Sequence, residues 1–316
     1  MVKMYYTDVE TNDTSETKIF QKGNWINMIN PTKDEIELIC EAVNIEPNFI
    51  HYALDAEEKA RIDMEDDGTI LFIIDVPVSE EENGNIVYTT MPVGIIIVRD
   101  EFLITVSLKE NALMTKMEQL VKKKSIASYK KSQFLFQVFY ENSSMYLNML
   151  KIINKKTELL EKTLKKSLKN EDLMKMLNIE KSLVYFTTSL KSNEIVMEKT
   201  LRGKIIKLYE EDEDLLEDSI IENKQAMEVA KTYSDILNET MDVYASVISN
   251  NINDVMKFLT TITIILAVPT LIASIWGMNV PVPLQYNQYG FVILIVASII
   301  ITLLTMIWFK KKDMLR

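Results

Sequence analysis

Cysteine, histidine and glycine are scarce in this sequence, and their scarcity excludes several classes of protein. Cys40 is the only cysteine among 316 residues, so the chain can form neither an intrachain disulfide nor a thiolate metal cluster. His51 is the only histidine, which excludes histidine-rich zinc sites and Ser-His or Cys-His catalytic pairs. The seven glycines form neither a P-loop nor a Rossmann fingerprint. We therefore expect a protein that is not an enzyme and that holds no organic cofactor.

Charged residues are absent from one long segment of the chain. Between residues 258 and 309 there is no Asp, Glu, Lys or Arg, and we expect that segment to lie in lipid. It divides into two apolar passes, 256–276 and 290–309, which are joined by a loop at 277–289. Each pass has about the 20 residues that cross the hydrocarbon core of a bilayer. The net charge of −11 argues against nucleic acid as a partner, because phosphates attract basic surfaces.

The distribution of cations predicts the orientation of the two passes. Lys257 stands at the start of the first pass, and the tail at 310–316 contains three lysines and one arginine. An excess of Lys and Arg marks the cytoplasmic side of membrane spans. The N-terminal residues have no apolar region of the signal-peptide kind, so we expect the long N-terminal part to stay in the cytoplasm. The sequence thus predicts a multi-pass protein of the cell membrane with both termini in the cytoplasm.

Residues 1–110 are expected to form an α+β cytoplasmic domain that resembles an α/β/α sandwich. Runs rich in β-branched and aromatic residues predict strands at Val2–Thr7, 17–21, 69–78, 86–98 and 102–106. Asn83-Gly84 between two of these runs is a turn signal. Thr32 and Glu35 have the spacing of a capping box and predict the start of a helix.

Residues 111–255 are expected to be helical. Helices are predicted over 133–168 and from 170 to about 202, where Gly203 marks a stop. From about residue 212 there is no Gly or Pro before Pro269, so one stalk helix is expected to run into the first pass. At 1.5 Å per residue, a helix over 212–276 is roughly 100 Å long. The predicted fold class is therefore an α+β domain, a long stalk helix and an all-α two-span membrane domain.

A polar seam follows one face of the first pass. Its members recur at alternating steps of three and four, and they are Asn253, Met256, Thr260, Thr263, Ala267, Thr270, Ser274 and Gly277. One interpretation is that small residues allow membrane helices to pack closely. The other is a water-lined pore formed by several copies of the helix. We favour the pore, because hydroxyls repeated through a bilayer are costly unless something polar passes them.

The same spacing continues backwards into the stalk helix. There it reaches Asp242, Glu239 and Asp235 and, further back, Asp218, with no Lys or Arg among its members. Facing a common axis, these carboxylates would raise the local concentration of cations in a cytoplasmic vestibule. The alternative is an ordinary solvated helix face, since an ideal helix drifts about 20° per heptad from this count.

At the end of the first pass, the residues resemble a known family. Gly277-Met278-Asn279 closes a penultimate span and is followed by a short loop, a last span and a lysine-rich tail. Further matches are Trp25-Ile26 before Pro31-Thr32, Leu54-Asp55 with Glu57-Glu58 and Arg61, and Ser249-Asn250-Asn251 with Asn253 and Met256-Lys257. This pattern is similar to that of the CorA family of magnesium and cobalt transporters, over essentially the whole chain. The resemblance implies a homopentamer with a funnel-shaped cytoplasmic domain that transports magnesium ions and is regulated by intracellular divalent ions.

The resemblance also implies roles for particular residues. Gly277, Met278 and Asn279 correspond to a selectivity filter, with Asn279 meeting the incoming ion. The inner polar ring corresponds to Asn253, the hydrophobic constriction to Met256 and Leu259, and a further pore position to Thr270. Asp242 corresponds to an acidic residue near the pore, and Asp218 to one half of a regulatory metal site between subunits. Its partner is expected among 80–82, with Glu80 taken as the candidate.

Three alternatives remain open at this point. The transported ion could be cobalt, nickel or zinc, with zinc moved outward as one variant. The resemblance implies magnesium at Met278, because zinc-moving relatives often vary the middle residue of the tripeptide, and the absence of His and Cys along the pore favours a hard hydrated ion. A membrane-anchored helical scaffold without transport is a second alternative, but it predicts an apolar seam. A metal-dependent hydrolase using Asp75 and the acids at 65–67 is a third, which lacks a clustered His or a phosphate loop. The loop at 280–290 lacks the acidic residues that many family members carry there, which questions electrostatic capture at the outer mouth.

Overall fold

The computed structural model describes residues 1–82, 85–167, 169–203, 205–206, 209–312 and 314. The Asn83-Gly84 turn predicted above lies outside these residues, as do 313, 315 and 316 of the tail. The chain divides into two compact units, Met1–Asn238 and Glu239–Arg316. Helix α6 (Glu210–Trp276) belongs to both, and each unit is described by itself. The domain boundaries that we expect from the sequence, at 1–110, 111–255, 256–276 and 290–309, stay predictions.

The first unit is built on a seven-stranded sheet with the order β2-β1-β3-β7-β6-β5-β4. The strands are β1 (Val2–Thr7), β2 (Thr14–Glu16), β3 (Trp25–Ile29), β4 (Arg61–Met64), β5 (Ile70–Glu82), β6 (Asn85–Val98) and β7 (Phe102–Ser107). Among the described strands, β3 and β7 form the parallel pair, and the other neighbours are antiparallel. The long β5–β6 pair has consecutive register from Ile70↔Ile97 to Glu82↔Asn85.

Both faces of the sheet are buried, because successive side chains of a strand point to opposite sides. On β5, Leu71 and Ile73 pack on one face while Phe72 and Ile74 pack on the other. Strands that are buried on both faces appear in a sequence as continuous apolar runs, and these runs predicted β5, β6 and β7.

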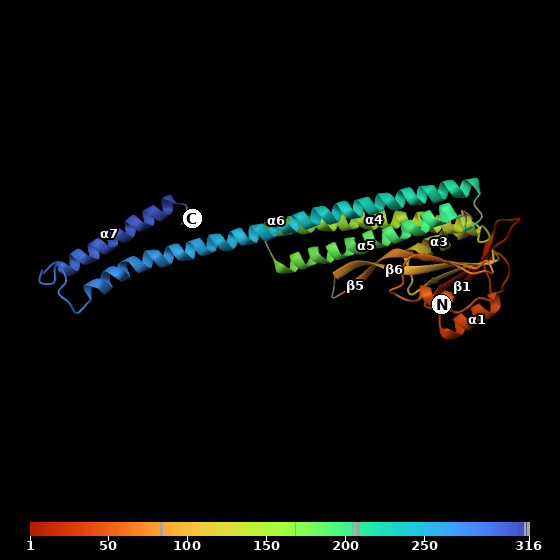
Figure 1. Ribbon diagram of the computed structural model, residues 1–316, viewed down its shortest axis with the longest axis horizontal. Coiled ribbons are helices and arrows are strands. Elements are labelled where there is room, and N and C mark those ends of the chain that lie inside the picture. The colour runs from red at the N-terminus through yellow and green to blue at the C-terminus, as the bar shows by residue number, and fades with distance from the viewer. Residues whose placement is uncertain (83–84, 168, 204, 207–208, 313, 315–316) are drawn as a thin grey trace. The chain divides into compact units, whose positions relative to one another are not determined.

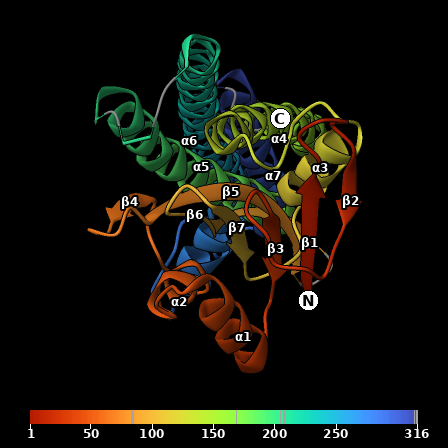
Figure 2. The ribbon, with the colours of Figure 1, turned by 90° about the vertical axis from the view of Figure 1, so that its right-hand side faces the viewer.

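Helices cover each face of the sheet. α1 (Lys33–Val43) and α2 (Asn48–Ala53) cover one face, and α3 (Ala112–Lys122), α4 (Lys131–Lys166) and α5 (Asn170–Gly203) cover the other (Figure 2). The capping box of α1 is present, with Thr32 and Glu35 each accepting a backbone N–H of the other residue. Gly94 of β6 leaves room for Ala53 of α2, because a Cβ at Gly94 would overlap the Cβ of Ala53.

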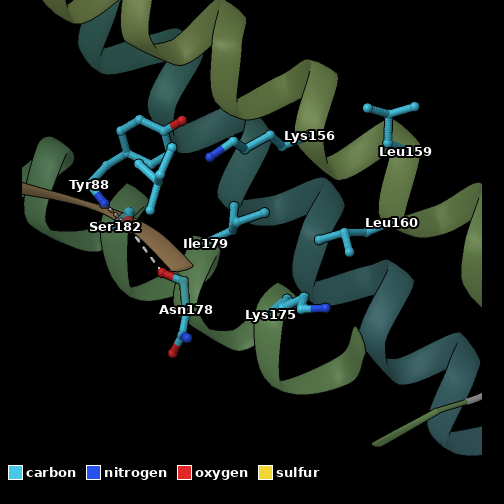
Figure 3. Close-up of a pocket in the computed structure, with 9 residues that line it drawn as sticks. Tyr88, Lys156, Leu159, Leu160, Lys175, Asn178, Ile179 and Ser182 are labelled. Carbon is cyan, nitrogen blue, oxygen red and sulfur yellow. Dashed lines mark hydrogen bonds between the residues drawn. The ribbon is translucent and has the colours of Figure 1, made fainter. Parts of the chain in front are cut away.

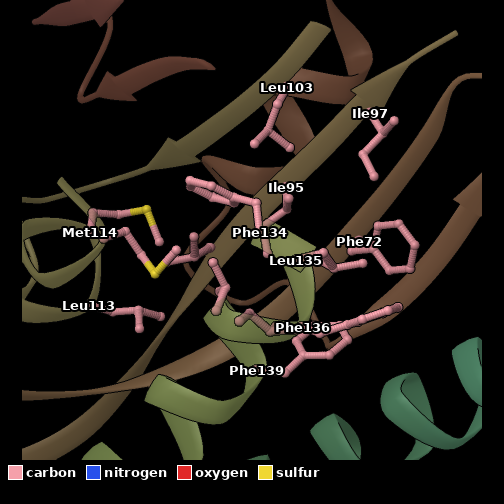
Figure 4. Packing of buried hydrophobic residues seen from close by; sticks show 14 of the residues in the cluster. Phe72, Ile95, Ile97, Leu103, Leu113, Met114, Phe134, Leu135, Phe136 and Phe139 are labelled. Atoms are coloured by element: carbon pink, nitrogen blue, oxygen red, sulfur yellow. The ribbon is translucent and has the colours of Figure 1, made fainter. Parts of the chain in front are cut away.

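The α4 helix supplies the largest part of the core. Phe134, Phe136 and Phe139 are fully buried and project onto β5 and β6 together with Leu135 (Figure 4). Beyond α4 and α5, the N-terminal part of α6 forms the outermost layer of this unit (Figure 1). The predicted fold class, with its α/β/α sandwich, long helix and two apolar helices, is confirmed.

One strand predicted from the sequence is wrong, and three of the described strands were missed. The strand predicted at 17–21 is wrong, since β2 ends at Glu16 and the chain then leaves the sheet edge. The Thr17 hydroxyl accepts the N–H of Ile19 at 3.1 Å, which turns the backbone locally instead of extending it. Strands β2, β3 and β4 were not predicted.

Asp75, which the hydrolase alternative used, has a structural position on β5. Its carbonyl oxygen accepts hydrogen bonds from Asn142 (3.0 Å), Asn193 (2.8 Å) and the hydroxyl of Tyr146 (3.1 Å). Its N–H donates to Asn193 Oδ1 at 2.8 Å. Burial raises the pKa of the Asp75 carboxyl, because the charged form loses its hydration. Asp75 therefore fastens the sheet to α4 and α5.

Candidate functional site

Among the residues that the structure describes, two helices are long and apolar enough to cross a membrane: α6, over its C-terminal part, and α7 (Gly290–Lys311). Few residues of their apolar windows are buried by the rest of the chain, unlike those of a core helix. Within the second unit, α7 runs back beside the C-terminal part of α6 (Figure 1). The first pass therefore ends at Trp276, directly before Gly277-Met278-Asn279.

Every member of the polar seam is exposed in the single chain. This holds for Asn253, Met256, Thr260, Thr263, Ala267, Thr270, Ser274 and Gly277, and Leu259 beside them is 57% exposed. One shallow groove is lined by Thr263, Ala267, Thr270 and Ser274, and another by Asn253, Met256 and Thr260. The predicted pore residues therefore lie along one side of α6, which, like most of this part of the helix, is not covered by the rest of the chain.

The hydroxyls of the seam fall into two kinds. Thr263 donates to the carbonyl of Leu259 and Thr270 to that of Leu266, both at 2.9 Å. Such bonds within the helix satisfy the hydroxyl proton, so they lower the cost of placing these residues in lipid. The side-chain hydroxyls of Thr260 and Ser274 have no hydrogen-bond partner in the described part of the chain. Water or another polar group in the proposed pore is therefore needed most by the Thr260 and Ser274 hydroxyls and by the side-chain amide of Asn253.

Thr261, which lies off the seam, is buried within the second unit. Its hydroxyl donates to the Lys257 carbonyl at 2.8 Å and lies 3.5 Å from the carbonyl of Met314. On α7, the partly covered positions include Ser298, Thr302 and Thr305, again at steps of four and three. Small hydroxylated residues at that spacing suit close packing of membrane helices. This second stripe was not predicted, although the spacing of its residues is visible in the sequence.

The loop after α6 is held compactly by its own backbone. The Trp276 indole N–H donates to the Pro283 carbonyl at 3.0 Å, and the Gly277 N–H to the Ala273 carbonyl at 2.9 Å. Leu284 has a positive φ of 69°, and a Cβ at Gly290 would lie 2.6 Å from the Leu284 carbonyl oxygen. Only glycine fits at position 290 without a backbone shift.

Asn279 sits in this loop with its side chain exposed. Its amide has no hydrogen-bond partner among the described residues, and Met278 beside it is 55% exposed. The three predicted filter residues therefore follow the helix end directly, and Asn279 keeps a free donor and acceptor.

In the first unit, α6 has one buried and one exposed face. Its buried positions include small and polar residues: Ser219, Asn223, Ala226 and Ala230. Ser219 donates to the Leu215 and Phe136 carbonyls at 2.7 and 3.3 Å, and Asn223 donates to the Leu190 carbonyl at 2.8 Å. These contacts hold α6 closely against α4 and α5.

The exposed face of the stalk carries the predicted acids. Asp218 and Asp235 are exposed in the first unit, and Glu239 and Asp242 are exposed in the second. Asp218 lies two positions after Leu216 of the buried face, which is about 200° around a helix. The Asp218 carboxylate therefore points away from the helices that α6 packs on.

An ion-pair network fixes the side of α6 that meets α5. Lys224 lies 3.2 Å from Glu194 and 3.0 Å from Glu198. The Lys224 ammonium, by its hydrogen bond, lowers the pKa of Glu198, and the two carboxylates raise the pKa of Lys224. The pairs are exposed and therefore contribute orientation more than stability.

The two residues proposed for metal regulation are not brought together within one chain. Asp218 is on α6, while Glu80 is on β5 and pairs with Lys109 at 2.8 Å. The described residues contain no group of three or more His, Cys, Asp or Glu side chains that could hold a metal ion. A magnesium ion keeps several waters and needs one or two carboxylates, so Asp218 fits as one of its ligands. The side chain of Glu82 lies outside the described residues.

Comparison with known proteins places the chain. The model of the CorA-like Mg²⁺ transporter proteins matches residues 20–311. The cobalt/magnesium transport protein CorA of Methanocaldococcus jannaschii is 28% identical over 291 residues, which cover 91% of this chain and 90% of the relative. The magnesium transport protein CorA of Helicobacter pylori strain J99 is 24% identical over 328 residues, covering 100% of this chain and 96% of the relative. The solved structure of the CorA magnesium transporter from M. jannaschii superimposes with a TM-score of 0.86 at 25% identity, covering 98% and 97% of the two chains.

The α/β domain is followed by the long helix α6, whose C-terminal part is the first of the two described apolar helices. This architecture is that of a membrane transport protein with two spans. This chain belongs to the CorA-like Mg²⁺ transporter family.

Proposed function

We propose that this protein transports magnesium ions across the cell membrane through a homopentameric channel, with both termini in the cytoplasm. The observation that carries the proposal is the uncovered polar face of α6, which ends at Gly277-Met278-Asn279. Five copies that turn this face inward would cover it and leave the apolar faces of α6 and α7 to lipid.

The chemistry of the proposed filter follows from the ion. Magnesium is small, strictly octahedral and gives up its water reluctantly. A ring of Asn279 amide oxygens can accept hydrogen bonds from the hydrated ion without removing its shell. Because Asn is neutral, the ion binds loosely enough to leave.

Cobalt is the second candidate ion. It appears beside magnesium in the name of the M. jannaschii relative. Nickel uptake and zinc uptake or export stay as further alternatives. Flux of magnesium, cobalt and zinc into proteoliposomes that contain the purified protein tests all of them together. If none of these ions moves, the transport proposal fails.

The inward orientation of the seam can be tested by thiol labelling, because Cys40 is buried and gives little background. A Ser274→Cys variant should react with a cationic, membrane-impermeant methanethiosulfonate, and its flux should then fall. An Ala273→Cys variant, one residue away and off the seam, should react roughly ten times more slowly, because a thiol in lipid stays protonated. Equal labelling of the two variants would contradict the pore.

For regulation, we propose that intracellular magnesium binds Asp218 together with an acid of a neighbouring subunit and favours the closed channel. Glu80 is the candidate partner, and it would have to leave Lys109. The acids Asp235, Glu239 and Asp242 would form the vestibule that concentrates cations below the pore.

An Asp218→Ala variant should need at least roughly tenfold more intracellular magnesium to inhibit its flux, since the loss of one contributing group weakens metal sites by such factors. The measurement is magnesium efflux from proteoliposomes at stepped magnesium concentrations. Glu217→Ala, the exposed acid next to it, is the matched control and should behave like the parent protein. Unchanged inhibition in Asp218→Ala would remove Asp218 from the sensor.

A further inference from the structure

A pocket unrelated to the ion path lies within the first unit. Its cavity of about 260 Å³ opens where β6, α4 and α5 meet (Figure 3). Most of its lining is apolar, with Tyr88 from β6, Leu159 and Leu160 from α4, and Ile179 from α5. Two lysines, Lys156 of α4 and Lys175 of α5, complete the wall.

The two lysines differ in their electrostatic environment. The positive charge of Lys175 is already compensated, because its ammonium lies 2.9 Å from the Glu171 carboxylate and 3.5 Å from that of Asp172. Lys156 points its ammonium at the face of Tyr88, 4.7 Å from the ring centroid. No carboxylate of the described residues forms an ion pair with it. The pocket thus presents one uncompensated cation beside an apolar cavity.

The Ser182 hydroxyl in the pocket is already satisfied. It accepts the Tyr88 N–H at 3.3 Å and donates to the Asn178 carbonyl at 3.0 Å. Lys156 is therefore the charged group left to orient a ligand. A metal cation is a poor occupant, because no carboxylate lines the cavity and both lysines repel it.

The size of the cavity limits the ligand. An apolar cavity of about 150 Å³ holds benzene, and drug-sized ligands occupy about 300 Å³ or more. The space here fits one aromatic ring or a short alkyl chain with a single polar end. We propose that this pocket binds a small organic monocarboxylate, whose apolar body packs against Leu160 and Ile179 and whose carboxylate pairs with the Lys156 ammonium.

The test uses the full-length protein in detergent with 3-phenylpropionate as the probe and 3-phenylpropan-1-ol as its neutral counterpart. Binding is measured by saturation-transfer NMR titration. The acid should bind more tightly than the alcohol, and Lys156→Met should weaken binding of the acid by roughly tenfold or more, because hydrogen bonds to charged groups are the strong ones. Binding of the alcohol should be unchanged in this variant, which shows that the pocket is intact.

Lys155→Met is the matched control, because Lys155 is exposed on the same helix and does not line the cavity. It removes the same charge from the protein and should leave both affinities unaltered. Three results would each overturn the proposal: no binding of the acid at millimolar concentrations, equal binding of acid and alcohol to the parent protein, or equal loss in the two lysine variants. None of these readouts depends on ion flux.

Discussion

An Asn279→Ala variant should show no magnesium uptake in proteoliposomes, while it assembles like the parent protein. The Asn279 amide is exposed, has no intrachain partner in the described residues, and follows directly on the helix that carries the polar seam. Alanine removes the oxygens that would accept hydrogen bonds from the water shell of the ion. Because the change is repeated in every subunit, the whole ring is lost at once.

Asn279→Asp should fail in a different way. A ring of carboxylates attracts cations strongly, so the ion should enter readily and leave slowly, or a different divalent ion should be preferred. Dye-based flux with magnesium and cobalt separates these results. Gln285→Ala changes another exposed amide of the same loop and serves as the control. Normal uptake by Asn279→Ala would disprove the filter assignment.

Replacing Met256 or Leu259 by Ser should produce a channel that no longer closes at high magnesium. Both side chains are more than half exposed in the single chain, at 55% and 57%, on or beside the polar seam. In an assembly with that face inward, they would form an apolar constriction that is closed by dewetting. A hydroxyl stabilises water there, and each 1.36 kcal/mol removed from a barrier speeds passage about tenfold.

We therefore expect residual flux at inhibiting magnesium concentrations to rise by at least about tenfold in Met256→Ser and Leu259→Ser. The measurement is efflux from magnesium-loaded proteoliposomes. Val255→Ser makes the same kind of change at an exposed position off the seam and should leave closure intact. If all three variants close normally, Met256 and Leu259 do not form the apolar constriction.

Local signals in the sequence account for much of the fold. The capping box at Thr32 and Glu35, the long apolar runs of β5 and β6, and the start of α5 at Asn170 with its end at Gly203 are features of neighbouring residues. The missed strand β3 depends on distant ones, because it pairs in parallel with β7, and Trp25 lies opposite Leu103. β4 is only partly buried and is defined by its pairing with β5 more than by its composition.

The candidate site shows the same division. Periodicity placed Thr263, Thr270 and Ser274 on one face of α6, and all three are exposed there. It could not distinguish the hydroxyls that donate to their own helix from those that do not, because that depends on side-chain rotamers. Nor could it identify a second ligand for Asp218, and the described residues of one chain contain no group of three or more His, Cys, Asp or Glu side chains that could hold a metal ion.

The close seating of α6 on α4 and α5 restricts how a sensor at Asp218 can act. Rotation of this part of the helix about its own axis would break the hydrogen bonds of Ser219 and Asn223 and drive exposed carboxylates into the apolar contact. Closely packed elements of this kind switch between discrete arrangements and do not twist continuously. If the proposed metal site exists, metal release at Asp218 would therefore move this part of α6 together with α4 and α5 and would not turn it about its own axis.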